Sequence, residues 1–351
     1  MNGMPEVAPP ARLPRAPLLA AAIAALPAFL MPFLSDDWAN MRTGADGILG
    51  PTPYGYFRPL SQATFVLDRA VWGTWAMPWH LTNLVFAVAA TALLTALVQR
   101  HLRDRALAGL TGLLYALHPY HINNVAWISA RGDLLCATFL FATLLAYDRW
   151  RERPRRAPWT AFLLFEAALL SKETAVVLPV VAAAIGWARD RRPPRRAEVA
   201  RGLLPLVAIG LLHVAWIRPL ALGSSGLGML EWFGPGALGN LVRYATAAVI
   251  PAQAEQFSDG PSLLGGFGAM GALAIATGAL TLAFLGISAR ARSGRVPAAA
   301  FVACALFVLL ALPSLLWFRS WSMLIPGAAA SLLLATLLDA AGRRAAVGAG
   351  A

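Results

Sequence analysis

Long apolar runs recur along the whole sequence and limit what it can fold into. Most runs hold about 16 to 25 residues, which is the length of a helix that crosses the hydrocarbon core of a bilayer. The runs lack the alternating pattern of a membrane β-barrel strand. Hydrophobic residues make up 58% of the chain and charged residues 13%, whereas about 25% of a soluble domain is charged. The sequence therefore predicts an all-α polytopic integral membrane protein.

The apolar runs also predict how the chain is divided. The first run is longer than the core of a signal peptide and no clear cleavage pattern follows it, so we expect a retained anchor. The expected parts are a tail at 1–16, a transmembrane domain at 17–338 with a long outer loop at 35–78, and a second tail at 339–351. We expect about ten spans, at 17–34, 79–98, 106–118, 133–148, 158–171, 174–188, 202–219, 263–288, 297–316 and 321–338.

Positive charge gathers in the loops on one side of these spans. The strings "QRHLRDR", "DRWRERPRR" and "RDRRPPRRAEVAR" hold many of the 29 lysine and arginine residues. Because basic loops stay in the cytoplasm, both tails are predicted to be cytoplasmic. We interpret these clusters as solvated loop charge beside membrane lipids, and we expect no nucleic-acid partner.

The predicted outer loops carry most of the remaining polar residues. The loop at 35–78 begins with the adjacent carboxylates Asp36 and Asp37. Its aromatic residues are typical of a segment in the lipid headgroup layer. Lys172, the only lysine, lies in the tight string "SKE". The ionisable residues of the later outer loops include His118, His121, Arg131, Asp133, Lys172, Glu173 and Arg319.

Two interpretations of these outer charges are open. Charges at a membrane boundary are costly, and they often mark a substrate path or a paired site. The cations can bind a lipid phosphate while an acid activates a nucleophile. Alternatively, each cation pairs with a neighbouring acid, Arg131 with Asp133 and Lys172 with Glu173.

Several strings occur in the order seen in a known group of membrane enzymes. They are "SDDWANM", "YFRPLSQATFVLD", "WHLTNLVF", "HPYHINNVAWISARGDLLCATFLFATLLAY", "LLSKETAVVLPVV" and "FRSWSMLIPGAAASLLLA". On these strings the chain resembles glycosyltransferases of the GT-C fold, above all the transmembrane and tetratricopeptide-repeat O-mannosyltransferases and their bacterial relatives. The sequence itself contains no 34-residue helical repeat.

The resemblance implies transfer of a sugar, expected to be a hexose, from a polyprenyl-phosphate carrier to an acceptor hydroxyl of a protein, glycan or lipid. It also implies a bacterial inner membrane, with the active site facing the periplasm. The family's catalytic carboxylate matches Asp36 and Asp37, and its phosphate ligands match Arg131, Lys172 and Arg319. We further assign Arg58, Asp133, His118 and His121 to donor binding, and His80, Asn83 and Glu173 to support of the site.

The chemistry of such a transfer requires few groups. A base must take the proton of the acceptor hydroxyl, and cations must stabilise the leaving phosphate. Attack from the face opposite the phosphate inverts the anomeric centre. Adjacent side chains in irregular backbone usually point apart, so we expect one of Asp36 and Asp37 to be the base and the other to orient it, bind the acceptor or hold a cation.

No cofactor is expected with certainty, although a divalent cation at Asp36 and Asp37 stays open. His118 and His121 have no assured third ligand, so a cap or hydrogen-bonding role is favoured over a metal site. Glu166 falls inside a predicted span and must be neutral or paired.

Two other functions stay open. A flippase or transporter for lipid-linked sugars would share the spans and the cations but needs no base. The second function is that of a scaffold without catalytic activity. It stays open because the sequence departs from the family pattern at Ala87, Gly132 and Phe318.

Overall fold

The structure is a computed structural model. It describes residues 13–217 except 54, 155 and 191, then 240–241, 244–245, 247–248, 303, 306–307, 310–311 and 320–349. The α-helices are α1 Ala16–Ala24, α2 Asp37–Met41, α3 Pro59–Trp72, α4 Ala76–Leu102, α5 Arg105–Leu117, α6 Pro119–Ala126, α7 Arg131–Arg151, α8 Trp159–Ser171, α9 Leu178–Asp190, α10 Arg196–Glu198, α11 Leu204–Leu212 and α16 Leu324–Ala349. Short 3₁₀ turns are η1 Leu26–Leu30, η2 Ala45–Gly47, η3 Ile128–Ala130, η4 Glu173–Val177 and η10 Ser320–Met323, and π-helical turns are η5 Val199–Leu203 and η6 His213–Ile217.

The described residues are helical, without a strand, as the composition predicts. Three helical segments are long and apolar enough to cross a membrane, namely Ala76–Leu102, Ile128–Arg151 and Arg196–Ile217. Shorter apolar helices cover Ala16–Leu30, Arg105–Leu117, Trp159–Ser171 and Leu324–Asp339. The predicted span at 263–288, and most of the one at 297–316, lie outside the described residues, so the number of ten spans stays a prediction.

Two predicted segments differ in detail. The span predicted at 174–188 starts as the 3₁₀ turn η4 and becomes helical only at Leu178. The tail predicted to begin at residue 339 continues the helix α16 as far as Ala349. In both cases hydropathy located the apolar segment but not the residue at which the helix begins or ends.

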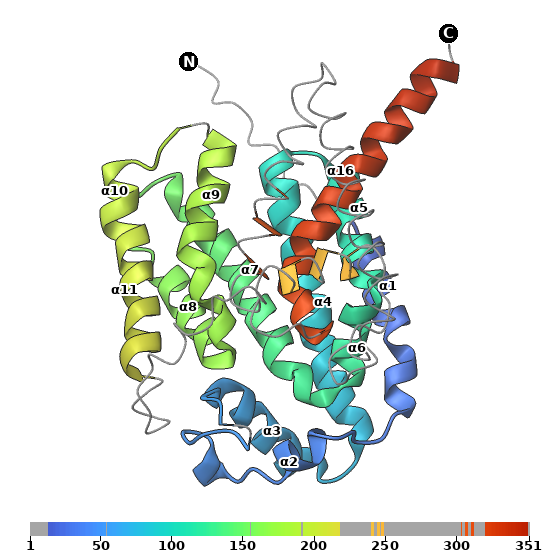
Figure 1. The fold of residues 1–351 in the computed structure, drawn as a ribbon, viewed down its shortest axis with the longest axis vertical. Helices are drawn as coiled ribbons and strands as arrows, with labels where there is room; N and C mark the ends of the chain where they lie inside the picture. The colour runs from blue at the N-terminus through green and yellow to red at the C-terminus, as the bar shows by residue number, and fades with distance from the viewer. Residues whose placement is uncertain are drawn as a thin grey trace, which may run out of the picture.

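Successive helices run back and forth between two ends of the bundle. Helices α2 and α3 lie together at one end, and α10 and the C-terminal end of α16 lie at the opposite end (Figure 1). Helix α7 is the most buried of the three long segments and packs against α4, α8, α9 and α16. Among the described residues, the predicted outer loop that contains α2 and α3 therefore lies at one end, and the basic segment that contains α10 lies at the opposite end.

Small residues allow α1, α4 and α5 to pack closely. A Cβ added at Gly112 of α5 would lie 2.9 Å from Pro17 Cβ, and it would also meet Thr95 Oγ1 of α4. Arg103 joins α4 to α5 in a left-handed conformation (φ 53°), and Asp104 caps α5 by accepting a hydrogen bond from Leu107 N at 2.9 Å. Close backbone approach through small residues is a common way to pack membrane helices.

The helix α3 is amphipathic and lies within the first outer loop. Its buried side contains Ser61, Gln62, Phe65 and Asp68. Its exposed residues include Val71 and Trp72, and Trp75 follows at 57% exposure. These exposed apolar side chains agree with a segment in the headgroup layer, whereas Phe57 and Phe65 are buried and hold the loop on the bundle.

Candidate functional site

The acidic pair lies at the α2–α3 end, where the chain leaves the first apolar helix. Asp36 precedes α2 and Asp37 is its first residue. Asp37 is 1% exposed, whereas Asp36 is partly exposed and its Oδ1 accepts a hydrogen bond from Ser35 Oγ at 3.1 Å. The two carboxylates therefore have different surroundings, as expected for adjacent residues in irregular backbone.

Asp37 is held by hydrogen bonds from two other segments. Ser129 donates to Asp37 Oδ1 from its backbone N at 2.7 Å and from its Oγ at 2.6 Å, and Leu34 N donates to Oδ2 at 2.9 Å. Asn40 Nδ2 donates to Ser129 Oγ at 3.0 Å, and Gln62 Nε2 donates to Asn40 Oδ1 at 3.4 Å. Burial raises the pKa of Asp37, and these hydrogen bonds from Ser129 and Leu34 oppose that rise. Asp37 is thus fixed in place, and Asp36 is the carboxylate left accessible.

Arg131 is fully buried at the start of α7. Its Nη1 lies 2.6 Å from Asp68 Oδ2, and its Nε donates to Asn83 Oδ1 at 2.7 Å. Its Nη2 donates to the carbonyl oxygen of Trp79 at 3.0 Å, and its guanidinium lies 4.7 Å from the centre of the Phe65 ring. The partner is therefore Asp68 on α3 and not Asp133. These contacts give Arg131 a structural role, and its binding of phosphate stays a prediction.

His80 and Asn83 brace the same region from the first turns of α4. The two ring nitrogens of His80 lie 3.1 Å from the carbonyl oxygens of Met31 and Val125. Asn83 Nδ2 donates to the carbonyl oxygen of Asn124 at 3.1 Å. Both side chains are completely buried. They tie the segment before Asp36 to the segment before Arg131, and their support of an active site stays a prediction.

Lys172 forms an ion pair with Asp133. Its Nζ lies 2.6 Å from Asp133 Oδ1, and both side chains are nearly buried. Lys172 has extended backbone (φ −162°, ψ 135°), so its side chain points away from that of its neighbour Glu173. The local pair with Glu173 is therefore not formed.

Glu173 pairs instead with Arg58, the residue just before α3. Arg58 Nη2 donates to Glu173 Oε1 at 2.7 Å, and Arg58 Nε donates to Glu173 Oε2 at 3.1 Å. Burial would raise the pKa of Glu173, but the charge and hydrogen bonds of Arg58 outweigh it and lower this pKa to about 2. Both side chains keep about 20% exposure, so this pair is the more accessible of the two.

His118 and His121 flank the first turn of α6. His118 Nδ1 accepts a hydrogen bond from Tyr120 N at 3.3 Å. His121 Nδ1 lies 2.6 Å from the carbonyl oxygen of Tyr115, and burial lowers the pKa of His121 to about 3. A neutral, buried imidazole is a poor ligand for phosphate. Within the part of the chain that the structure describes, no group of three or more His, Cys, Asp or Glu side chains is placed to hold a metal ion.

The string "ISARGD" joins the parts of this site. Ser129 holds Asp37, Arg131 binds Asp68, and Asp133 binds Lys172. Gly132 lets the other elements approach, because a Cβ there would lie 3.2 Å from Ser61 Oγ and from the carbonyl oxygen of Ser171. The longest of the characteristic strings is therefore also the segment that connects the carboxylate pair to the cations. Arg319 lies outside the described residues.

Sequence reasoning missed Asp68, Ser129, Asn40 and Gln62. The positions of Ser61, Phe65 and Asp68, four and three residues apart, are a signal that they share one helix face. Ser129 carries no comparable signal in the sequence. Its partner Asp37 is 92 residues away along the chain, and only the folded arrangement brings the two together.

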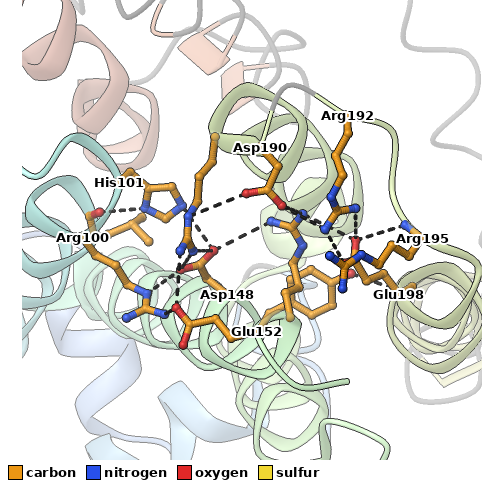
Figure 2. Close-up of polar contacts among 12 residues, drawn as sticks. Arg100, His101, Asp148, Glu152, Asp190, Arg192, Arg195 and Glu198 are labelled. Atoms are coloured by element: carbon orange, nitrogen blue, oxygen red, sulfur yellow. Dashed lines mark hydrogen bonds and ion pairs between the residues drawn. The ribbon is translucent and has the colours of Figure 1, made fainter. Parts of the chain in front are cut away.

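The opposite end of the bundle carries a network of ion pairs. Arg189 Nη1 donates to both oxygens of Asp148 at 2.7 Å, and Arg100 and His101 approach the same carboxylate (Figure 2). Arg151 lies 2.8 Å from Asp190 and 3.5 Å from Glu198. Arg151 is only 7% exposed. The prediction of solvated loop charge is therefore wrong for Arg151, which bridges α7 to α9 and α10.

Comparison with known proteins gives partial matches. The chain is 32% identical over 160 residues to Protein O-mannosyl-transferase Tmtc2 of Drosophila melanogaster, which covers 43% of this chain and 16% of that protein. It is 33% identical over 128 residues to Protein O-mannosyl-transferase Tmtc1 of Drosophila melanogaster, and this match covers 35% of this chain and 14% of that protein. It is 30% identical over 115 residues to Protein O-mannosyl-transferase TMTC2 of Homo sapiens, and this match covers 33% of this chain and 13% of that protein.

The matched regions thus span about one sixth or less of these relatives. No family model matches the chain, and no solved structure matches it. Over part of its length, the chain is therefore similar to proteins named protein O-mannosyl-transferases.

Proposed function

We propose that this chain is a membrane glycosyltransferase that transfers a hexose from a polyprenyl-phosphate carrier to an acceptor hydroxyl, with inversion. We propose further that it has the GT-C fold, acts at the outer face of a bacterial inner membrane, and uses a protein, glycan or lipid as acceptor. The names of its relatives support a transferase acting on a hydroxyl group. The geometry of the acidic pair supports the same chemistry.

The observation that carries the proposal is the difference in burial between Asp36 and Asp37. Asp37 is buried and accepts hydrogen bonds from Ser129 and Leu34, whereas Asp36 is partly exposed. We assign Asp36 as the base and Asp37 as the residue that positions it. The acceptor oxygen attacks the anomeric carbon while the bond to the phosphate oxygen breaks. Asp36 takes the hydroxyl proton, and the polyprenyl phosphate leaves with the bonding electrons.

The leaving phosphate needs positive charge, and Lys172 and Arg58 suit it better than Arg131. An ammonium group has three donors, and Lys172 uses one on Asp133. Arg58 uses its Nε and Nη2 on Glu173, so its other edge can bind a second anion. Arg131 is completely buried among its own partners, so phosphate could reach it only if those contacts broke.

The test measures sugar transfer by purified protein supplied with polyprenyl-phosphate sugars. We expect Asp36→Asn to lower the turnover number by about 100-fold or more, the usual effect of removing a general base. Asp46→Asn changes an exposed acid in the same outer loop and serves as the matched control, with activity near that of the parent. Melting temperatures in detergent show whether each variant remains folded.

Full activity of a folded Asp36→Asn variant would overturn the assignment of the base. If the parent transfers no sugar from any donor but moves the lipid across vesicles, the transporter function applies instead. Assays with and without a chelator decide whether a divalent cation takes part.

A further inference from the structure

Glu166, the acid inside an apolar helix, has a partner on the neighbouring helix. Glu166 Oε1 lies 3.1 Å from His213 Nδ1, so α8 is joined to the end of α11. His213 is completely buried, and the side chain of Glu166 is 31% exposed. Ionisable groups within spans are costly to hold and usually mark a functional position. The sequence could not assign a role to Glu166, and this pair provides a starting point.

The other ring nitrogen of His213 lacks a partner. Nε2 is buried and has no hydrogen-bond partner among the described residues. A buried polar atom left without a partner typically costs about 1–3 kcal/mol, and most such atoms in native proteins are paired. Glu166 holds Nδ1 and thereby fixes the direction of the ring. The orphaned Nε2 therefore points to a polar group that is bound only during function.

Three neighbouring features suggest the chemistry of that group. The ring of Phe57 lies 6.3 Å from the ring of His213, and Phe57 immediately precedes the accessible cation Arg58. His213 begins the π-helical turn η6, a kind of distortion that is frequent at functional sites. Helix α11 and the turn η6, which contains His213, also have exposed apolar side chains, namely Leu204, Val207, Leu211, Leu212 and Trp216.

An anionic headgroup attached to an apolar chain fits all of these features. The exposed residues of α11 can contact hydrocarbon, while Nε2–H of His213 donates to a phosphate oxygen. The carboxylate of Glu166 can accept a hydrogen bond from Nδ1, so Nε2 is the ring nitrogen left to bind the phosphate. We infer that His213, held by Glu166, binds the phosphate of the lipid-linked sugar donor through Nε2–H. This inference rests on the proposed function, because it names a further ligand for the donor of the same reaction.

The experiment measures binding of sugar-free polyprenyl phosphate to the full-length protein, together with the kinetics of transfer. We expect His213→Gln to weaken binding of polyprenyl phosphate by about tenfold or more, as for loss of one hydrogen bond to a charged group. The KM for the donor should rise by a similar factor, while kcat changes less than threefold. Glu166→Gln should weaken binding in the same direction but by less, because Oε1 can still accept from Nδ1.

His101→Gln is the matched control. It alters a histidine that lies 3.5 Å from the carboxylate of Asp148 at the opposite end of the bundle, so binding and KM should stay at parent values. A lower kcat with unchanged donor KM and unchanged lipid affinity in His213→Gln would overturn the inference. If His213→Gln does not fold, parent-like lipid affinity of Glu166→Gln would overturn it equally.

Two further results separate the possible causes. Inorganic phosphate that competes as strongly as polyprenyl phosphate would show a site for the free anion and would overturn the lipid assignment. Lipid binding that depends on His213, in a protein that transfers no sugar from any donor, would reject the proposed transferase and keep the binding site.

Discussion

Two serines lie close to the acidic pair, and only one of them holds the buried carboxylate. Ser129 donates twice to Asp37, whereas Ser35 donates once to the more exposed Asp36. We predict that Ser129→Ala lowers the free energy of unfolding by about 1–3 kcal/mol, because a buried carboxylate loses a donor. Ser35→Ala should change it by less than about 0.5 kcal/mol. Chemical unfolding in mixed micelles measures both changes in the free energy of unfolding. Equal changes would contradict the assignment of Asp37 as the buried, fixed carboxylate and Asp36 as the accessible one.

The pair of Arg58 and Glu173 should make stability depend on acidity. The pKa of Glu173 in the folded protein is lowered to about 2, mainly by Arg58 acting against burial. The stabilisation is thus complete above the ordinary value of 4.5 and is lost as the pH falls toward 2.

Thermal unfolding of the parent and of Glu173→Gln between pH 7 and pH 2.5 tests this. The difference in melting temperature should be constant above pH 5 and shrink below it. A difference in melting temperature that stays constant down to pH 2.5 would show that the pKa of Glu173 is not lowered in the folded protein.

At the scale of the helices, Gly112 decides how closely α1, α4 and α5 can approach. We predict that Gly112→Ala lowers the free energy of unfolding by about 1–3 kcal/mol, because the added methyl group meets Thr95 and Pro17. Gly50→Ala is the matched control, since a Cβ there has nothing nearer than 3.7 Å. Unfolding in detergent compares the two. A parent-like Gly112→Ala variant would show that these helices can separate without cost.

The long apolar helices were predictable, but most side-chain partners were not. Hydropathy predicted spans at 79–98 and 133–148, and the helices run from Ala76 to Leu102 and from Arg131 to Arg151. The predicted ion pair between Arg131 and Asp133 is wrong, because residues two apart in a helix face different sides. The actual partner, Asp68, lies on the separate helix α3, and nothing in the local sequence links the two.

For the candidate site as a whole, the family strings lie on segments that come together in the folded chain. The strings around Asp36, Arg131 and Lys172 meet at one end of the bundle, as the predicted topology requires (Figure 1). The sequence could not tell which aspartate is buried, because that depends on Ser129 and Leu34 in the folded chain. It also could not show that Arg131 is enclosed while Arg58 keeps partial exposure.

The orientation of the whole molecule gives a prediction about labelling. Arg42 is exposed near the acidic pair, and Arg153 is exposed beyond the other end of α7. In a chain whose cysteines are replaced, we predict that Arg42→Cys reacts with a membrane-impermeant maleimide added to intact cells. Arg153→Cys should react only after the membrane is permeabilised. The reverse pattern would place the acidic pair in the cytoplasm and contradict the proposed outer site.

Helix length adds a consequence for the depth of the site. Helix α8 has 13 residues, so it is about 20 Å long, roughly 10 Å less than the hydrocarbon thickness of a bilayer. If α8 crosses the membrane with Lys172 at the outer face, as we propose, either Lys172 lies below the outer headgroups or the lipid layer thins around it. Under the proposed function, a carrier lipid would in both cases bring its phosphate to Lys172 from the side, within the membrane, and only the acceptor would have to arrive from water.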